Sequence, residues 1–171
     1  MAESSAPRAL RVNALELLRQ PGTIREIEVS APGDELDVDH EALDGDVVVG
    51  VRLESLTDGI TVRGAVVVPW SRPCRRCLTD LAGESVAEVD ELYQVELIDE
   101  EAFEIVDNQL DLAPMARQSA LLELDDERVC RVDCAGLCPE CGADLNVTAC
   151  GCDTEVRDDR WAALDGLVLD D

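Results

Sequence analysis

Eight cysteines in four close pairs constrain this 171-residue chain more than any other feature. The pairs are Cys74 with Cys77, Cys130 with Cys134, Cys138 with Cys141, and Cys150 with Cys152. Residues 1–20 contain no apolar stretch of signal-peptide length, and no run of apolar residues is long enough for a transmembrane helix. We therefore expect a cytoplasmic protein, where disulfides are rare and clustered cysteines usually bind a metal ion.

The eight cysteines predict two tetrahedral Cys₄ sites, because four thiolates complete one site and the single histidine, His40, is not near them in the sequence. Zn²⁺ is the favoured ion; iron–sulfur clusters accept the same ligands, but nothing in the sequence indicates electron transfer. By sequence proximity, the last four cysteines can close one site and the first four the other. Segment 138–142 is the clearest knuckle, since Gly142 permits a turn with positive φ. Redox-active thiols are the competing interpretation, and they need a lowered pKa and a thioredoxin-like context that the pattern does not show.

The charge balance limits the partners. The chain has 39 acidic residues against 14 arginines and no lysine, a net charge of −25. Such a surface repels phosphate, so we expect a basic protein as partner and not a broad nucleic-acid footprint; solubility alone is the alternative reading. Residues 80–128 hold 16 of the acidic residues and two arginines, a net −14. Within them we expect a mobile acidic loop over Ile98–Asn108, or else a solvated helix face, and we name Glu100, Glu101 and Glu104 as candidate contacts for the partner.

Arg72, Arg75 and Arg76 form the one basic cluster, beside the first cysteine pair. Two roles are open for them. They can neutralise the thiolates of a metal site, which is the favoured interpretation. Alternatively, they can contact RNA or another anion next to Trp70.

The apolar patterns predict an α+β fold with an antiparallel sheet from about Thr23 to Val95. Alternating apolar residues mark strands in residues 47–53, 60–68 and 86–95, and Asp58-Gly59 indicates a hairpin. Helical spacing predicts helices near Ala9–Gln20 and Asp111–Leu122, with Asp111 as the cap. We expect an α+β sheet domain with the acidic loop in residues 1–129. A cysteine-rich zinc-binding tail, residues 130–171 with a short closing helix, should pack on it as one structural unit.

The cysteine strings resemble those of the YceD family, bacterial proteins known as large ribosomal RNA subunit accumulation proteins. The matching residues are Cys74-Arg75-Arg76-Cys77-Leu78, Cys130, Cys134, Gly136-Leu137-Cys138-Pro139, Cys141-Gly142, Asp144-Leu145-Asn146 and Cys150-Gly151-Cys152. Leu17-Leu18, Pro21-Gly22, Leu110-Asp111-Leu112 and the closing Arg160, Ala162, Ala163 and Leu164 also fit. The chain departs from the family in having no proline between Leu122 and Val129, and Asp159 where proline is common.

The resemblance implies a non-enzymatic factor that supports 23S rRNA synthesis, processing or stability and large-subunit biogenesis, with metal as scaffold. In this family the gene commonly neighbours that of the small basic ribosomal protein L32. Joined to the acidity of the chain, this makes L32 or a pre-ribosomal particle the expected partner, with weak or no binding to naked RNA. The alternatives are a thiol redox protein and an rRNA-processing enzyme. A nuclease needs clustered carboxylates for Mg²⁺, and no such cluster stands out.

Overall fold

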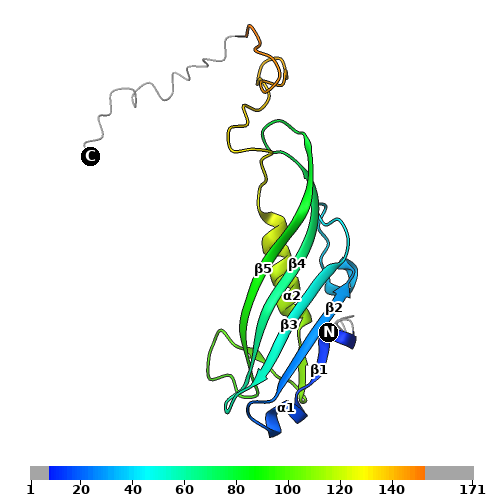
Figure 1. The fold of residues 1–171 in the computed structure, drawn as a ribbon, viewed down its shortest axis with the longest axis vertical. Helices are drawn as coiled ribbons and strands as arrows, with labels where there is room; N and C mark the ends of the chain where they lie inside the picture. Colours follow the sequence, from blue (N-terminus) through cyan, green and yellow to red (C-terminus); the bar gives the residue numbers. More distant parts are fainter. Residues whose placement is uncertain (1–7, 153–171) are drawn as a thin grey trace, which may run out of the picture. The chain divides into compact units, whose positions relative to one another are not determined.

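The computed structural model describes residues 8–152 (Figure 1). Their contacts form two compact units. In the described part of the chain, unit 1 comprises residues 8–72 and 80–127, and unit 2 comprises residues 73–79 and 128–152. The expected packing of a tail of residues 130–171 on a domain of residues 1–129 stays a prediction. The expected closing helix, with Arg160 to Leu164, lies outside the described residues.

Unit 1 is built on a five-stranded sheet in the order β2-β3-β4-β5-β6 (Figure 1). The strands are β2 (Ile24–Ala31), β3 (Val47–Ser55), β4 (Ile60–Pro73), β5 (Asp80–Gln94) and β6 (Phe103–Glu104). β3 is antiparallel to both β2 and β4, whereas β6 adds to β5 in parallel. The predicted hairpin at Asp58-Gly59 is confirmed, because Ser55 and Ile60 are paired across it. The α+β class with a largely antiparallel sheet is therefore confirmed.

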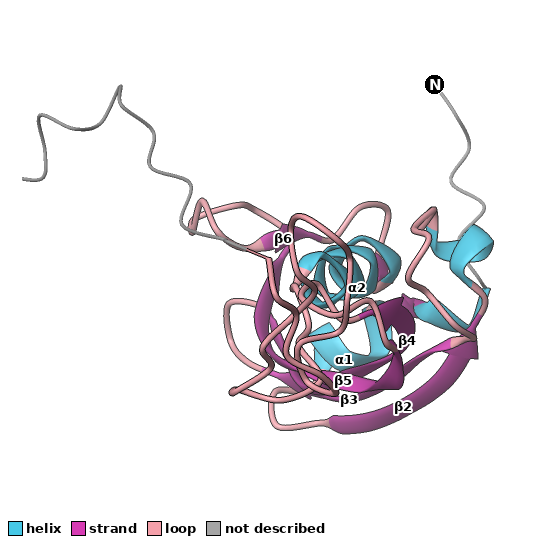
Figure 2. Ribbon diagram, turned by 90° about the horizontal axis from the view of Figure 1, so that it is seen from above, coloured by secondary structure: helices cyan, strands magenta, loops and turns pink. Residues whose placement is uncertain are grey.

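The core of unit 1 lies between the sheet and helix α2 (Ala113–Asp125), around which the sheet curls (Figure 2). Alternating valines of β3 and β4 point into this core, and their neighbours point outward, as a period of two requires. The helix contributes small and flexible side chains that fit a tightly curved sheet: Ala113, Met115, Ala116, Ala120 and Leu124.

Helix α2 differs from its predicted bounds at both ends. The expected cap at Asp111 is wrong, because the N-cap residue is Leu112 and no side chain caps the helix from that position. The Asp111 carboxylate, one residue earlier, still accepts a hydrogen bond from the Ala113 N–H at 3.0 Å and so satisfies one donor of the first turn. At the other end the helix continues past Leu122, whose side chain is 67% exposed, to bury Leu124. The Arg72 guanidinium then donates to the carbonyls of Leu124 and Asp126, at 2.9 and 2.7 Å. These bonds satisfy acceptors at the helix end that have no partner within the helix.

The predicted helix over Ala9–Gln20 is wrong in extent. This stretch contains the 3-10 turn η1 (Arg8–Leu10), strand β1 (Arg11–Asn13) and the short helix α1 (Leu15–Arg19). β1 pairs antiparallel with β7 (Gln109–Asp111), and the Asn13 side chain accepts from the Leu15 N–H where α1 begins. The helical spacing did identify buried residues, since Leu10, Ala14 and Leu17 are all in the core. However, Leu10 belongs to η1, Ala14 lies between β1 and α1, and Leu17 belongs to α1.

The acidic stretch Ile98–Asn108 is not a loop or a helix face throughout. It holds β6 and the buried Ile105, and the Phe103 ring stacks on Tyr93 with centroids 5.0 Å apart. Gln94, the last residue of β5, is buried although it is polar. Its amide oxygen accepts from the Ile98 and Asp99 N–H groups, both at 3.1 Å, and so fixes the start of the stretch.

The connection between β2 and β3 also contributes to the core. It contains the 3-10 turn η2 (Gly33–Leu36) and buries Leu36, Val38 and Ala42. Across the described part of the chain, none of the helices has the length and apolar character needed to cross a membrane.

Candidate metal centres

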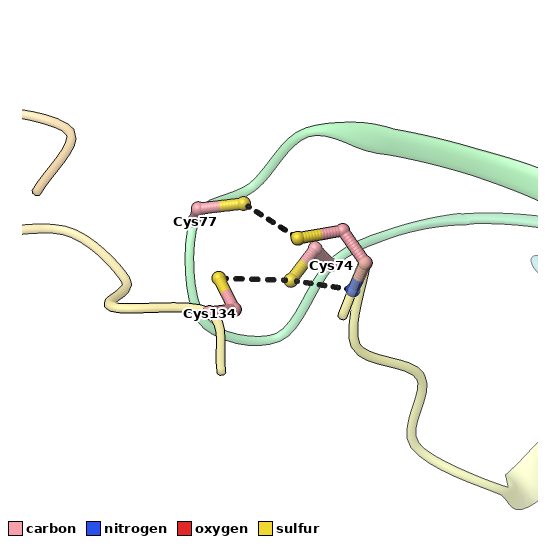
Figure 3. A group of neighbouring side chains, drawn as sticks. Cys74, Cys77 and Cys134 are labelled. Atoms are coloured by element: carbon pink, nitrogen blue, oxygen red, sulfur yellow. Dashed lines mark hydrogen bonds between the residues drawn. The ribbon is translucent and has the colours of Figure 1, made fainter. Parts of the chain in front are cut away.

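The first cysteine tetrad consists of Cys74, Cys77, Cys130 and Cys134, all in unit 2. Cys74 and Cys77 lie in the turn between β4 and β5, and the other two follow α2 in the chain. The four Sγ atoms all lie within 4.8 Å of one another. Figure 3 shows the labelled sulfurs of Cys74, Cys77 and Cys134 turned toward a common centre. The Sγ atoms of Cys74 and Cys134 are 4.0 Å apart, and those of Cys77 and Cys130 are 3.7 Å apart.

The second tetrad consists of Cys138, Cys141, Cys150 and Cys152, whose Sγ atoms also lie within 4.8 Å of one another. The structure therefore brings the eight cysteines together in the two sets expected from sequence proximity. All eight are free thiols.

The two C-x-x-C turns, which we call knuckle 1 (Cys74–Leu78) and knuckle 2 (Cys138–Gly142), have the same backbone hydrogen bonds. In each, the N–H of the fifth residue donates to the carbonyl of the first cysteine at 2.9 Å. The N–H of that cysteine donates to a carbonyl just beyond the turn, at 2.8 Å. Both fifth residues have positive φ, 60° at Leu78 and 71° at Gly142. The positive φ predicted for Gly142 is confirmed, and knuckle 1 adopts the same conformation without a glycine.

The donor set fits a tetrahedral Zn²⁺ ion. Zn–S bonds of about 2.3 Å place the sulfurs of a tetrahedral site about 3.8 Å apart. The measured separations in the first tetrad, 4.0 and 3.7 Å, bracket that value and are far longer than the roughly 2.05 Å of a disulfide. Either tetrad can therefore hold a metal ion through thiolates alone. Such an ion would supply a cross-link that stabilises the fold.

Within the first tetrad, the surroundings of the sulfurs favour different protonation states. Backbone N–H groups, that of Cys77 first, lower the pKa of Cys74 to about 6. A hydrogen bond with Cys134, followed by burial, raises the pKa of Cys130 to about 12.

The second tetrad repeats this contrast. The Cys141 N–H lowers the pKa of Cys138 to about 7, and a hydrogen bond with Cys141 raises the pKa of Cys152 to about 12. In both tetrads the first knuckle cysteine is thus the preferred thiolate. Cys130 and Cys152, whose pKa values are raised, have to release a proton before they can bind a metal ion as thiolates.

The three candidate arginines are in different places. Arg72 belongs to unit 1 and binds the end of α2, as described above. Arg75 is exposed in knuckle 1, and its N–H donates to the Arg128 carbonyl. The Arg76 guanidinium donates to the carbonyls of Val132 and Cys134, at 3.2 and 3.1 Å. The backbone N–H of Arg76 donates to Cys74 Sγ at 3.5 Å. Their contact with RNA or another anion stays a prediction.

Asn146 is a residue of this region whose role the motif analysis missed. It lies between the two cysteine pairs of the second tetrad, yet its side-chain amide donates to Cys134 Sγ of the first tetrad at 3.5 Å. The available signal was the string Asp144-Leu145-Asn146, in which two Asx residues favour a local turn with side-chain hydrogen bonds.

The acidic candidates lie in unit 1. Glu100, Glu101 and Glu104 are exposed, the last of them in β6. Sequence reasoning missed a groove of about 260 Å³ between β5 and α2, which we call the β5–α2 groove. It combines carboxylates with apolar side chains and is lined by Ala87, Glu88, Glu91, Met115, Gln118, Ser119, Leu122 and Glu123. The sequence feature that could have indicated the groove was Leu122, a large apolar residue in a predicted helix of the acidic segment, which the structure leaves exposed.

The family model described as large ribosomal RNA subunit accumulation protein YceD matches residues 62–168. The chain belongs to the YceD family. It is 33% identical to an uncharacterized protein of Mycobacterium tuberculosis and to one of Mycobacterium bovis, each alignment covering 96% of this chain and 87% of the relative. An uncharacterized protein of Mycobacterium leprae is 29% identical over 90% of this chain and 75% of the relative. No solved structure matches.

The YceD match contains most of β4, all of β5 and α2, and all eight cysteines. Strands β2 and β3 precede it. The family is named for the accumulation of large-subunit ribosomal RNA and is not a known enzyme family. In this YceD protein, two features are candidates to explain the role that the family name implies: the two cysteine tetrads and the acidic surface of unit 1.

Proposed function

We propose that this YceD protein is a non-enzymatic cytoplasmic factor that supports 23S rRNA accumulation by binding a basic protein of the large ribosomal subunit. Family membership supports the role in rRNA accumulation. The distribution of charge supports the choice of a protein partner. The described part of unit 1 carries 28 acidic residues and eight arginines, a net −20. Ribosomal protein L32 is the first candidate partner.

The observation that carries the choice of partner is the β5–α2 groove. Its carboxylates, from Glu88, Glu91 and Glu123, surround apolar atoms of Met115 and the exposed Leu122. An arginine or lysine side chain has an apolar stem and a cationic end, and so matches both kinds of surface. A basic protein can therefore place such side chains in the groove, whereas a phosphate backbone would be repelled.

Glu91 in the groove lies close to other carboxylates. Burial, and then the nearby carboxylates of Asp90 and Glu101, raise the pKa of Glu91. Of these neighbours, Asp90 forms an ion pair with Arg63 at 2.9 Å. A cation from a partner would relieve this crowding of negative charge, which is a direct electrostatic gain on binding.

We also propose that each tetrad binds one Zn²⁺ and that both ions are structural. The ligands of this proposal are the eight cysteines named above. Because all donors are thiolates and each set is complete with four, no coordination position is left for a substrate or water. The ions would thus fix the fold of unit 2 and would not take part in a reaction.

The test is binding of the purified full-length protein to purified L32 and, separately, to naked 23S rRNA at low salt. We expect L32 to bind, with an affinity that falls as salt rises, and RNA to bind poorly. Residual RNA binding should disappear when Arg72, Arg75 and Arg76 are replaced by Ala. Tight RNA binding that survives this replacement would overturn the proposal.

The groove is tested by the pair Glu88→Gln and Glu91→Gln. Its matched control is Glu26→Gln with Glu28→Gln, an equal change of charge at two exposed positions of edge strand β2. The groove variant should bind L32 several-fold more weakly than the control. Equal effects of the two variants would mean that only net charge matters and that the groove is not the docking site. In a strain lacking the gene, 23S rRNA should fall relative to 16S rRNA and recover with the wild-type chain.

A further inference from the structure

The Asn146 side chain is the centre of a hydrogen-bond network in unit 2. Its Oδ1 accepts from the Ala135 N–H at 2.8 Å and from the Arg131 guanidinium. Its Nδ2 donates to the Asp144 carboxylate at 2.7 Å and to Cys134 Sγ at 3.5 Å. Two donors therefore face the oxygen and two acceptors face the nitrogen. Only one orientation of the amide satisfies all four contacts, so the group that points to the sulfur is the N–H.

The position of Asn146 depends on the hairpin that carries the second tetrad. Leu137 and Asp144 form an antiparallel bridge, and the Cys138 N–H donates to the Ala143 carbonyl. Directly beyond, the Leu145 N–H donates to the Gly136 carbonyl, and Asp144 accepts from the Asn146 N–H. Asn146 thus lies four residues after knuckle 2, next to Leu145, whose backbone bond to Gly136 belongs to the folded hairpin.

Knuckle 1 is hydrogen-bonded to the same hairpin. The Arg76 carbonyl, between Cys74 and Cys77, accepts from the Leu137 N–H at 3.0 Å. The approach is close: a Cβ on Gly136 would lie 3.0 Å from the Arg76 oxygen, and Gly136 has φ +77°. A residue adjacent to the second tetrad and a residue inside the first are therefore in direct backbone contact, at a position that requires glycine.

Little else in the second hairpin can order it. In residues 137–152 the one buried hydrophobic side chain is that of Cys138, and Cys141 and Cys152 are exposed. A segment with so small a core depends on its metal for folding. When the second tetrad is empty, Asn146 therefore loses the hairpin that aims it at Cys134.

We infer that the two metal sites are coupled: loading of the second tetrad places the Asn146 amide on Cys134 and so strengthens metal binding at the first. An N–H donated to a thiolate stabilises its charge, and hydrogen bonds of this kind to metal ligands are typically worth 10–100-fold in metal affinity. The inference rests on the proposal that both tetrads bind metal. Zinc binding to unit 2 is then cooperative. The fraction of chains that hold one ion is smaller than it would be if the two sites bound zinc independently.

The test compares zinc affinities of full-length variants, measured by competition with a chromophoric chelator. Asn146→Asp keeps the acceptor oxygen for Ala135 and Arg131 but removes the N–H. It should weaken one of the two zinc-binding steps about 10–100-fold and leave the stoichiometry unchanged. The matched control is Asn108→Asp, the same substitution and charge change in unit 1. It should bind zinc as the wild type does.

A second variant avoids changing Asn146. Replacing Cys141 and Cys152 by Ser disables the second tetrad, and the remaining site should then bind zinc with the weakened affinity. Adding Asn146→Asp to this background should have little further effect, because the amide is no longer positioned. Wild-type affinity at the remaining site, or an Asn146→Asp variant equal to wild type, would overturn the coupling while the zinc proposal stands. Failure of the wild type to bind zinc would overturn both.

Discussion

Units 1 and 2 are held together by different means. In unit 1, a continuous set of buried apolar side chains fills the space between the sheet and α2. In the described part of unit 2, the buried hydrophobic side chains are four cysteines: Cys74, Cys77, Cys134 and Cys138. The charges differ as well. Against the net −20 of unit 1, the described part of unit 2 has four arginines and three acidic residues, a net +1.

The two units offset the conformational entropy lost on folding in different ways. Ordering the backbone costs conformational entropy, and unit 1 offsets that cost by removing apolar surface from water. Unit 2 has too little apolar surface to do so, and in this account thiolate–metal bonds replace the core. Unit 1 can therefore carry a dense negative surface without losing its fold, which suits it to attract a basic partner.

Metal removal should separate the two units most clearly. With a strong chelator, amide hydrogens of residues 128–152 should lose protection from exchange, whereas those of β3 and β4 stay protected. The reason is that, as proposed, only unit 2 depends on metal for its fold. Hydrogen exchange followed by mass spectrometry on the full chain measures both units at once. Loss of protection in β3 and β4 under the same conditions would contradict the contrast.

A core truncation should have the reverse effect. Leu53 is fully buried in β3, so Leu53→Ala should lower the free energy of unfolding of unit 1 by about 2–5 kcal/mol. Zinc content should not change. Urea unfolding measures the first and metal analysis the second. The control is Leu122→Ala at an exposed position of α2, where we expect a change within about 0.5 kcal/mol.

The two knuckles permit a smaller test within unit 2. Gly142→Ala places a side chain where φ is 71° but where no atom lies within 4 Å of the new Cβ, so its cost is conformational alone. We expect weaker zinc binding at the second site by about 1 kcal/mol. Leu78→Gly should act in the opposite direction at the first site, by less than about 1 kcal/mol, because glycine also loses more entropy on folding. Zinc competition measures both, and the same sign for the two changes would refute this reading of the knuckles.

The smallest effect concerns the acidic surface. Replacing Glu100, Glu101 and Glu104 by Gln should slow association with L32 a few-fold at low salt and leave zinc content unchanged. Exposed charges steer encounters over a screening length of roughly 8 Å at physiological ionic strength, so the difference should fade as salt is added. Stopped-flow kinetics at several salt concentrations tests this. A rate that does not depend on the three carboxylates would exclude them from steering.

The sequence allowed prediction of those features whose signal is local. Alternating valines identified β3 and β4, Asp58-Gly59 identified their hairpin, and C-x-x-C spacing with proximity identified the two tetrads. The rest depends on contacts between distant segments. Leu10, Ala14 and Leu17 have helical spacing, yet strand β1 lies between Leu10 and Ala14 and interrupts the helix, because it pairs with β7, about a hundred residues away. Likewise, no spacing rule relates Asn146 to Cys134, because the hairpin of knuckle 2 brings them together.

The most direct measurement of the central claim is the zinc content of the intact protein, purified without chelator and examined by native mass spectrometry together with elemental analysis. The two complete tetrads predict two zinc ions per chain. Replacing Cys138 by Ser should reduce this number and expose residues 137–152 to exchange, because the second site would lose its buried ligand. Fewer than one zinc per chain in the wild-type protein, with unit 2 still protected from exchange, would contradict the claim that metal holds unit 2 together.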